Sequence, residues 1–260
     1  MNCAPTADVS GDITDDAFLG GRLHLLQPRR GHRSGHDAML LAAAAAARPG
    51  DAVADLGCGV GAAGLAVAAR VADLALTCVD VDANLVAMAV ENARRNGFAA
   101  QGICLDVTSS AAVFAEAGLT PDRFDRVIMN PPFNDSKRHQ PSPDAQRRLA
   151  HEADASTIAT WLHAARRILK PGGVVTVIWR AEALDQILAA LRTGFGGVSI
   201  LPVHSRPGAA ASRVLLRAEK GARAPTVLLE GPVLNNAEGR STDFIRAVLE
   251  GREVLPLAKM

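Results

Sequence analysis

Short apolar runs alternate with longer segments of helical period through most of this chain, and this alternation limits the folds open to it. The apolar runs end in Gly, Asp or Pro, residues that stop strands and start turns. The pattern predicts an α/β fold with a doubly wound, mainly parallel, seven-stranded sheet of Rossmann-like topology. In the first half we expect strands at Ala52–Leu56, Ala75–Asp80, Gln101–Leu105 and Phe124–Met129, and helices at Ala62–Arg70, Asn84–Asn96 and Ala111–Ala117.

The second half follows a long polar segment, residues 134–150, that has neither a helical nor a strand period. Such a segment beside a functional turn is predicted to be a lid. Lys170-Pro171-Gly172-Gly173 is expected to end the helix that comes next. The expected helices are Ser156–Leu169, Glu182–Arg192 and Thr242–Leu249, and the expected strands are Val174–Trp179, Val198–Val203, Arg213–Arg217 and Thr226–Leu229.

The first 50 residues are expected to form a small extension that packs on a main domain, residues 51–260. Residues 1–15 are polar and predict a loose tail. Ala17 to Leu26, interrupted by Gly20-Gly21, predicts a hairpin. Asp37 is expected to cap a helix from Ala38 to Ala47.

Composition and charge narrow the class of protein. The net charge of +1 argues neither for nor against a polyanionic partner, so only local clusters of basic residues could indicate one. The cysteines lack metal-ligand spacing, so no metal is expected, and Cys58, Cys78 and Cys104 are predicted to be reduced core thiols. With no leader peptide and no apolar stretch long enough to span a bilayer, we expect a cytoplasmic protein. The sequence leaves the oligomeric state open between monomer and homodimer.

Three glycines alternate in the first turn from strand to helix, at positions 57, 59 and 61. They allow positive φ angles and a close approach of the backbone to a ligand. Gly59 to Gly64 also satisfies the GxGxxG dinucleotide pattern, so the glycines fit NAD as well as another adenosine-containing cofactor. Asp55 favours the second class, because its carboxylate suits an ammonium group and would repel a pyrophosphate.

Two further acids end predicted strands. Asp80 could accept both ribose hydroxyl protons in either class of cofactor, and Asp106 could accept from an adenine amino group. Asp82 is instead expected to be a helix N-cap. Each acid alone would fit a solvated loop, but three successive strand ends that carry Asp favour a binding site.

Asn130-Pro131-Pro132-Phe133 directly follows the apolar run 126–129. An adenine amino group or a carboxamide nitrogen is a poor nucleophile, because its lone pair is delocalised. The side-chain carbonyl of Asn130 and the main-chain carbonyl of Pro131 could accept its two N–H protons and draw the nitrogen toward tetrahedral geometry. The two prolines stiffen the turn, and Phe133 could stack on the target plane.

These motifs resemble those of class I S-adenosylmethionine-dependent methyltransferases that act on amino nitrogens. The resemblance implies that Asp55 and Gly57 flank the methionine end of S-adenosylmethionine, that Asp80 holds the ribose and that Asp106 reads the adenine. Phe133 departs from the Tyr that is usual at this position, so any role of a hydroxyl there is lost.

Over nearly its full length the chain resembles the bacterial tRNA adenine-N6 methyltransferases that modify a valine tRNA. The resemblance extends from residues 35–42, which include Asp37, to residues 212–216 and 229–232. It implies a tRNA substrate. Basic residues that could contact its phosphates lie before the first helix and after the Asn-Pro-Pro-Phe turn: Arg29, Arg30, His32, Arg33, Lys137, Arg138, His139, Arg147 and Arg148.

Three alternatives stay open. A protein glutamine methyltransferase of release factors resembles the chain in its Asn-Pro-Pro turn, but only 54 residues precede Asp55, too few for the helical domain of that family. A ribosomal RNA guanine-N2 methyltransferase would carry a second, duplicated domain. An NAD(P)-dependent dehydrogenase or a nucleotide-binding module explains the glycines and leaves Asn130 to Phe133 as an accidental turn.

Overall fold

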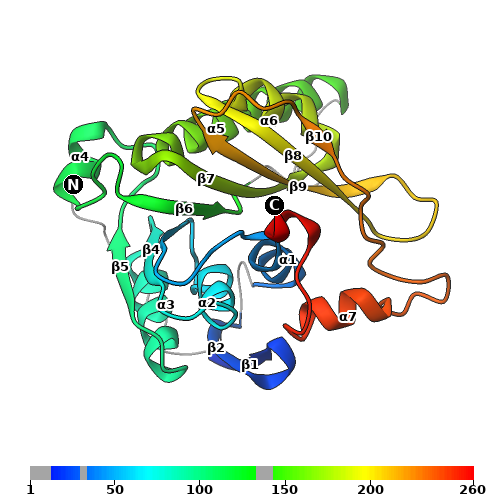
Figure 1. The fold of residues 1–260 in the computed structure, drawn as a ribbon, viewed down its shortest axis with the longest axis horizontal. Coiled ribbons are helices and arrows are strands. Elements are labelled where there is room, and N and C mark those ends of the chain that lie inside the picture. The colour runs from blue at the N-terminus through cyan, green and yellow to red at the C-terminus, as the bar shows by residue number, and fades with distance from the viewer. Residues whose placement is uncertain (1–12, 30–33, 133–142) are drawn as a thin grey trace.

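The computed structural model describes residues 13–29, 34–132 and 143–260, with only the backbone for residues 143–154. Its main feature is an eight-stranded sheet in the order β10-β8-β9-β7-β6-β3-β4-β5 (Figure 1). The strands are β3 (Ala52–Leu56), β4 (Ala75–Asp80), β5 (Ala100–Cys104), β6 (Phe124–Met129), β7 (Leu169–Arg180), β8 (Phe195–His204), β9 (Ala211–Lys220) and β10 (Val227–Leu228).

The sheet is mainly parallel, as predicted. Strands β5, β4, β3, β6 and β7 run parallel to one another, and β9 is antiparallel to both β7 and β8. The eighth strand, β10, has two residues and pairs with the outer side of β8. The mainly parallel, doubly wound architecture is therefore confirmed. The strand expected at Thr226–Leu229 is present as the short β10, so the sheet has eight strands where seven were expected.

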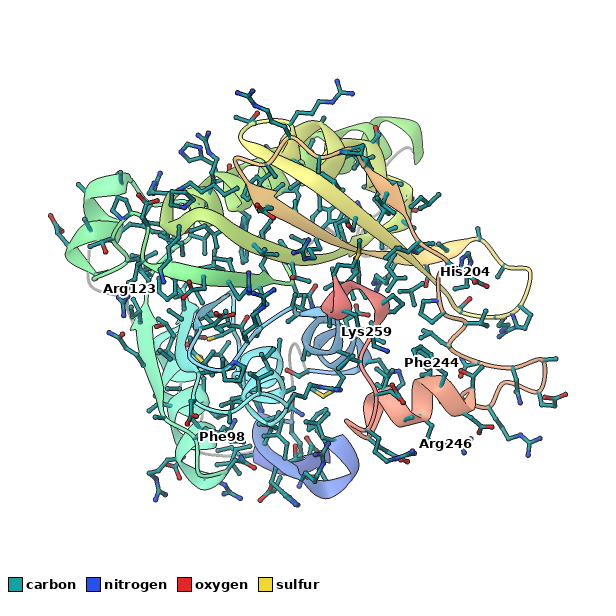
Figure 2. All side chains as sticks on the ribbon, viewed as in Figure 1. Phe98, Arg123, His204, Phe244, Arg246 and Lys259 are labelled. Carbon is teal, nitrogen blue, oxygen red and sulfur yellow. The ribbon has the colours of Figure 1, made fainter. Side chains whose placement is uncertain are left out.

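Helices cover both faces of the sheet (Figure 1). One hydrophobic cluster joins the sheet to α1 (His36–Ala44), α2 (Ala62–Ala68), α3 (Ala83–Arg95) and α7 (Asp243–Leu249). A second cluster, on the other face, joins it to α4 (Ala111–Glu116), α5 (Pro143–Ile168) and α6 (Leu184–Leu191). Figure 2 shows the side chains that fill the space between the sheet and these helices. Short 3₁₀ turns occur at Leu19–Gly21, Ala181–Ala183 and Pro256–Lys259.

The predicted hairpin is present and begins earlier than expected. Strand β1 (Ile13–Phe18) pairs antiparallel with β2 (Leu23–Pro28) as a separate two-stranded sheet. Ile13 to Asp15 therefore belong to a strand and not to the loose tail. Leu19, Leu23 and Leu25 are buried in the same cluster as α1 and α2, which anchors the hairpin on the main sheet's core.

The polar segment after the Asn-Pro-Pro turn is helical where the structure describes it. Helix α5 begins at Pro143, so the prediction of irregular chain through residue 150 was wrong for residues 143–150. Proline fits the first turn of a helix, and Asp144 to Ala150 contain mostly residues of good helix propensity, even though the stretch has no apolar period. Residues 134–142 lie outside the described part of the chain.

Two smaller expectations also need correction. Helix α1 has Gly35 at its N-cap and ends at Ala44, so Asp37 is inside the first turn and does not cap the helix. Cys58 and Cys78 are buried free thiols, but Cys104 is disulfide-bonded. Cys104 lies on the edge strand β5 and is only partly buried, unlike the two thiols in the core.

No helix in the described residues is long and apolar enough to cross a membrane. The same residues contain no group of three or more His, Cys, Asp or Glu side chains that could hold a metal ion.

Candidate functional site

The strand register brings three predicted site residues to one level of the sheet. Leu56 on β3 pairs with Met129 on β6 and with Val79 on β4. The next residues along the three strands are Gly57, Asn130 and Asp80. Because these strands are parallel, the three residues lie side by side at the carboxyl edge, where open α/β sheets bind ligands.

The glycine turn after β3 is held by hydrogen bonds to the neighbouring strand. The amides of Gly57 and Cys58 both donate to the carbonyl oxygen of Val79, at 2.8 and 3.0 Å. Gly57, Gly59 and Gly61 have φ angles of 71°, 53° and 85°, and Gly61 is the N-cap of α2. The turn therefore requires the left-handed backbone region at every second residue, which glycine enters without a Cβ penalty.

Trp161 on α5 lies against the start of this turn. A Cβ added to Gly57 would sit 2.5 Å from Cη2 of the Trp161 ring, too close for any side chain. Trp161 is buried among the apolar residues of the second cluster. Its contact with Gly57 shows that the same ring also bounds the glycine turn.

A cavity of about 310 Å³ opens beside the turn. It brings together five of the predicted residues: Asp37, Asp55, Gly57, Gly59 and Asn130. Sequence reasoning missed the other lining residues as site residues, and they are Ser34, Gly35, His36, Ala38, Cys58, Ala62 and Ala63. Gly35, His36 and Ala38 belong to the stretch at residues 35–42 that carried the family resemblance, and this was the available signal.

Asp55 is the buried acid of the cavity. Its Oδ2 atom accepts a hydrogen bond of 2.8 Å from the amide of Gly64 on α2. Burial raises the pKa of Asp55 to about 7, the Gly64 amide acts in the opposite direction, and the nearby Asp80 raises it further. A carboxyl group in this environment gains from a cationic partner, because the partner would offset the cost of burying the charge.

Asp80 is fixed by two backbone amides. Its Oδ2 atom accepts from Gly59 at 2.8 Å, and its Oδ1 atom accepts from Asp82 at 3.0 Å. Asp82 caps α3 by accepting from the amides of Asn84 and Leu85, which confirms its predicted role. The carboxylate of Asp80 is thus tied to the glycine turn, with lone pairs left for further donors.

The remaining predicted acids lie in different surroundings. The carboxylate of Asp37 pairs with Arg213 of β9 at 3.0 Å, which links α1 to the antiparallel strand. Asp106 is exposed, and its Oδ1 atom accepts from the amide and the hydroxyl of Thr108. Asp106 does not line the cavity.

The Asn-Pro-Pro turn starts at the cavity wall. Asn130 is partly buried, Pro131 is buried and Pro132 is exposed. Phe133 and the basic residues Arg33, Lys137 and Arg138 lie outside the described residues, as do the side chains of Arg147 and Arg148 on α5.

The raised pKa of Asp55 predicts a pH dependence of stability. The folded protein keeps the Asp55 proton between the usual pKa of 3.8 and about 7, whereas the unfolded chain has lost it. This group's contribution to the free energy of unfolding therefore falls as the pH rises through that window. Denaturant unfolding at several pH values should show a shallower decline for Asp55→Asn than for the unmodified protein. Parallel curves for the two proteins would contradict the raised pKa.

Comparison with known proteins agrees with this geometry. Residues 35–205 match the methyltransferase small domain family. The tRNA1(Val) (adenine(37)-N6)-methyltransferase of Aeromonas hydrophila is 30% identical over 209 residues, 80% of this chain and 85% of that protein. The protein of the same name from Phocaeicola vulgatus is 32% identical over 194 residues, 70% of this chain and 74% of that protein.

A solved structure supports the same assignment. The crystal structure of a predicted O-methyltransferase from Agrobacterium tumefaciens superposes with a TM-score of 0.70 at 31% identity, and the match covers 84% of this chain and 98% of that one. These matches decide against the NAD(P)-dependent alternative that the glycine pattern alone left open. The chain belongs to the methyltransferase small domain family and is a class I S-adenosylmethionine-dependent methyltransferase.

Proposed function

We propose that this methyltransferase transfers a methyl group to the exocyclic N6 of an adenine in tRNA. The observation that carries the proposal is the position of Asn130, beside Gly57 at the edge of the sheet and in the wall of the same cavity. The names of the relatives from Aeromonas hydrophila and Phocaeicola vulgatus support adenine-37 of a valine tRNA as the acceptor. The proposed location is the cytoplasm, where such an RNA is found.

The cavity has the chemistry to hold S-adenosylmethionine. Its volume is at the lower end of the range of about 300–1,000 Å³ for small-molecule sites. We assign Asp55 and Gly57 to the cationic methionine end, because the buried carboxyl group of Asp55 gains from a positive neighbour. Asp80 is assigned to the ribose hydroxyls, Gly59 and Gly61 to close backbone approach, Asp37 to the cavity wall and Asp106 to the adenine.

When bound, S-adenosylmethionine supplies an electrophilic methyl group. The residues of the Asn-Pro-Pro turn orient the amine that receives the methyl group. The side-chain oxygen of Asn130 and the main-chain oxygen of Pro131 accept hydrogen bonds from its two N–H groups. Pro131 and Pro132 fix the backbone, so the acceptors need no reorganisation when positive charge develops on the nitrogen. Phe133 is assigned to stacking on the base. No general base is required, because solvent can take the proton after transfer.

The pair of acceptors favours a nitrogen over an oxygen as the methylated atom. The homologue from Agrobacterium tumefaciens is described as a predicted O-methyltransferase. A hydroxyl group has one proton and could satisfy one of the two oxygens, whereas a primary amino group satisfies both. The two proposed hydrogen-bond acceptors therefore support methylation of a nitrogen.

A methyl-transfer assay with unmodified tRNA, ribosomal RNA and a release-factor protein as separate acceptors tests the proposal. We expect label in tRNA, and nucleoside analysis should find it as N6-methyladenosine. Label in guanine of ribosomal RNA or in a glutamine side chain would replace the proposal with one of the two alternatives from the sequence. Each outcome leaves the assignment of the chain to the methyltransferases unchanged.

Asp80→Ala should weaken cofactor binding, because alanine can accept neither from ribose hydroxyls nor from the Gly59 amide. Hydrogen bonds to a charged acceptor contribute about 1.5–3 kcal/mol each. Titration calorimetry with S-adenosylhomocysteine should then show a loss of at least about tenfold in affinity. Asp80→Asn, which keeps one oxygen for the Gly59 amide, should lose less. Equal affinities for the three proteins would remove Asp80 from the site.

Asn130→Ala should abolish methyl transfer and leave the affinity for S-adenosylhomocysteine nearly intact, because Asn130 is assigned to the acceptor and not to the cofactor. Turnover and calorimetric affinity are measured on the same preparation. Turnover within about tenfold of the unmodified enzyme, a change of about 1.4 kcal/mol in activation free energy, would contradict the mechanism.

Replacing Lys137, Arg138, Arg147 and Arg148 together by alanine should weaken tRNA binding. The slope of log affinity against log salt should fall by about one for each phosphate that the variant no longer neutralises, and cofactor affinity should be unchanged. Filter binding over a series of salt concentrations measures both the slope and the tRNA affinity. If the slope and the affinity are unaltered, these residues do not bind RNA.

A further inference from the structure

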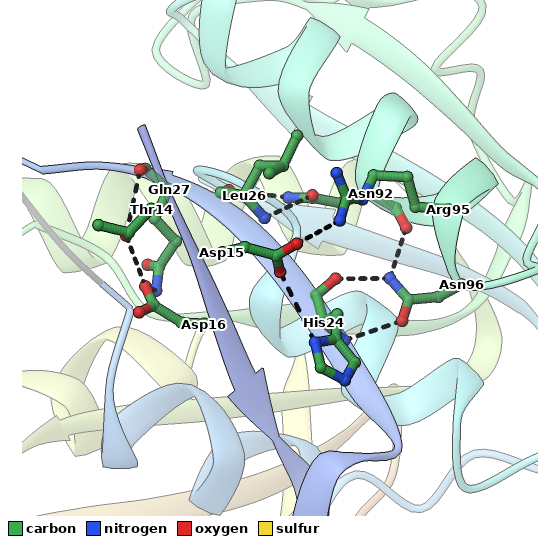
Figure 3. Close-up of polar contacts among 9 residues, drawn as sticks. All are labelled: Thr14, Asp15, Asp16, His24, Leu26, Gln27, Asn92, Arg95 and Asn96. Atoms are coloured by element: carbon green, nitrogen blue, oxygen red, sulfur yellow. Dashed lines mark hydrogen bonds and ion pairs between the residues drawn. The ribbon is translucent and has the colours of Figure 1, made fainter. Parts of the chain in front are cut away.

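Two asparagines of α3 bond to the backbone of β2 along the edge that does not pair with β1 (Figure 3). The side-chain oxygen of Asn92 accepts from the amide of Leu26 at 2.8 Å, and its nitrogen donates to the carbonyl of Leu26 at 3.0 Å. Asn96 makes the same pair of bonds to His24, at 2.9 and 2.7 Å. The match follows from geometry, because four residues of helix and two residues of strand both advance by about 6 to 7 Å.

Asn92 differs from Asn96 in one respect that concerns the site. Its side-chain nitrogen also donates to the carbonyl oxygen of Val60 at 3.0 Å, and Val60 lies between Gly59 and Gly61 in the glycine turn. Asn92 is completely buried, and all three of its side-chain bonds are to backbone groups. One buried amide thus connects the hairpin directly to the turn beside the cavity.

The next residue of β2 reaches a different wall of the same cavity. Gln27 is also buried, and its side-chain oxygen accepts from the amide of Ser34 at 2.8 Å. Its side-chain nitrogen donates to Asp16 of β1 at 2.9 Å, which holds the amide group in place. Ser34 lines the cavity. Two adjacent residues of β2 are therefore linked to the cavity by different routes. Leu26 is linked to the glycine turn through Asn92, and Gln27 is bonded to Ser34 in the segment before α1.

The glycine turn has particular need of such support. Gly59 and Gly61 both have positive φ, and glycine loses more conformational freedom on ordering than any other residue. A turn of this kind binds tightly only if the rest of the protein fixes it before the ligand arrives. The described contacts that fix it are the bonds to Val79, to Asp80 and to Asn92.

We propose that the β1–β2 hairpin is a positioning element of the cofactor site, and that Asn92 and Gln27 are the positioning residues through which it acts on the glycine turn and on the segment at Ser34. The inference rests on the cofactor site proposed above. Neither residue is assigned a contact with the cofactor or with the methyl acceptor.

The test uses Asn92→Ala with Asn96→Ala as a matched control. Each variant loses two bonds to the backbone of β2 and one further bond: Asn96→Ala loses the bond to the Asn92 carbonyl within α3, and Asn92→Ala loses the bond to Val60 in the glycine turn. Calorimetric titration with S-adenosylhomocysteine, well below the unfolding temperature of every variant, should show a loss of at least about tenfold for Asn92→Ala and less than about threefold for Asn96→Ala. In steady-state assays the loss for Asn92→Ala should appear in the KM for S-adenosylmethionine more than in kcat.

Two further variants keep the inference open to refutation if Asn92→Ala does not fold. Asn92→Asp has the same size and keeps the acceptor for the Leu26 amide, but it loses the NH₂ group that donates to the carbonyl oxygens of Leu26 and Val60, so it should also lose affinity. Gln27→Ala should also lose affinity for S-adenosylhomocysteine, because it loses the bond that holds Ser34 in the wall of the cavity. Similar affinities for the Asn92 and Asn96 variants, or normal affinity in Asn92→Asp and Gln27→Ala, would overturn the inference. Asp80→Ala distinguishes the proposed cofactor site from the proposed positioning role. If Asp80→Ala weakens cofactor binding and the Asn92 variants do not, the cofactor site is supported and the positioning role is contradicted.

Discussion

The carbonyl oxygen of Val79 accepts two successive amides, those of Gly57 and Cys58, and the rest of the site depends on this double contact. It ends the pairing of β3 with β4 and turns the chain out of the sheet at a fixed level. The parallel register then places Asn130 and Asp80 at the same level, on the two strands that flank β3. A cofactor held by the turn is consequently next to the residue that is proposed to hold the methyl acceptor.

The electrostatics of the cavity suit a cation better than an anion. Asp55 lines it, and Asp80 is near enough to Asp55 to raise its pKa, whereas the charge of Asp37, which also lines it, is already paired with Arg213. In dinucleotide-binding folds a glycine turn of similar sequence receives a pyrophosphate. Here the carboxyl group of Asp55 is buried behind the turn. Because this group attracts a positive charge, a glycine turn of the same kind fits a positively charged ligand. The difference between the two cofactor classes lies in Asp55 more than in the glycines.

The sequence predicted the bounds of β3, β4 and β6 correctly, because each is an apolar run with a clear stop: Leu56 before Gly57, Asp80 at the end of β4, and Met129 before Asn130. It placed the start of β7 at Val174, five residues after its true start at Leu169. It did not predict the first turns of α5, because an amphipathic period is absent there. The positioning roles proposed for Asn92 and Gln27 could not be predicted either, since both depend on contacts between different elements of the fold. Local patterns encode where strands stop, whereas the contacts that support the turn exist only after the layers have packed.

The contact between Trp161 and Gly57 gives the glycines unequal freedom to change during evolution. A side chain at position 57 is excluded twice, by the φ angle of 71° and by the indole ring 2.5 Å from where its Cβ would lie. At position 59 no other group in the described part of the protein lies near the place of a Cβ, and the φ angle of 53° is the constraint that the fold itself imposes. Gly59 lines the cavity, so a side chain there would also enter the space proposed for the cofactor. The two glycines of one motif therefore record different physical constraints: the protein's own indole ring closes position 57, whereas the proposed ligand closes position 59.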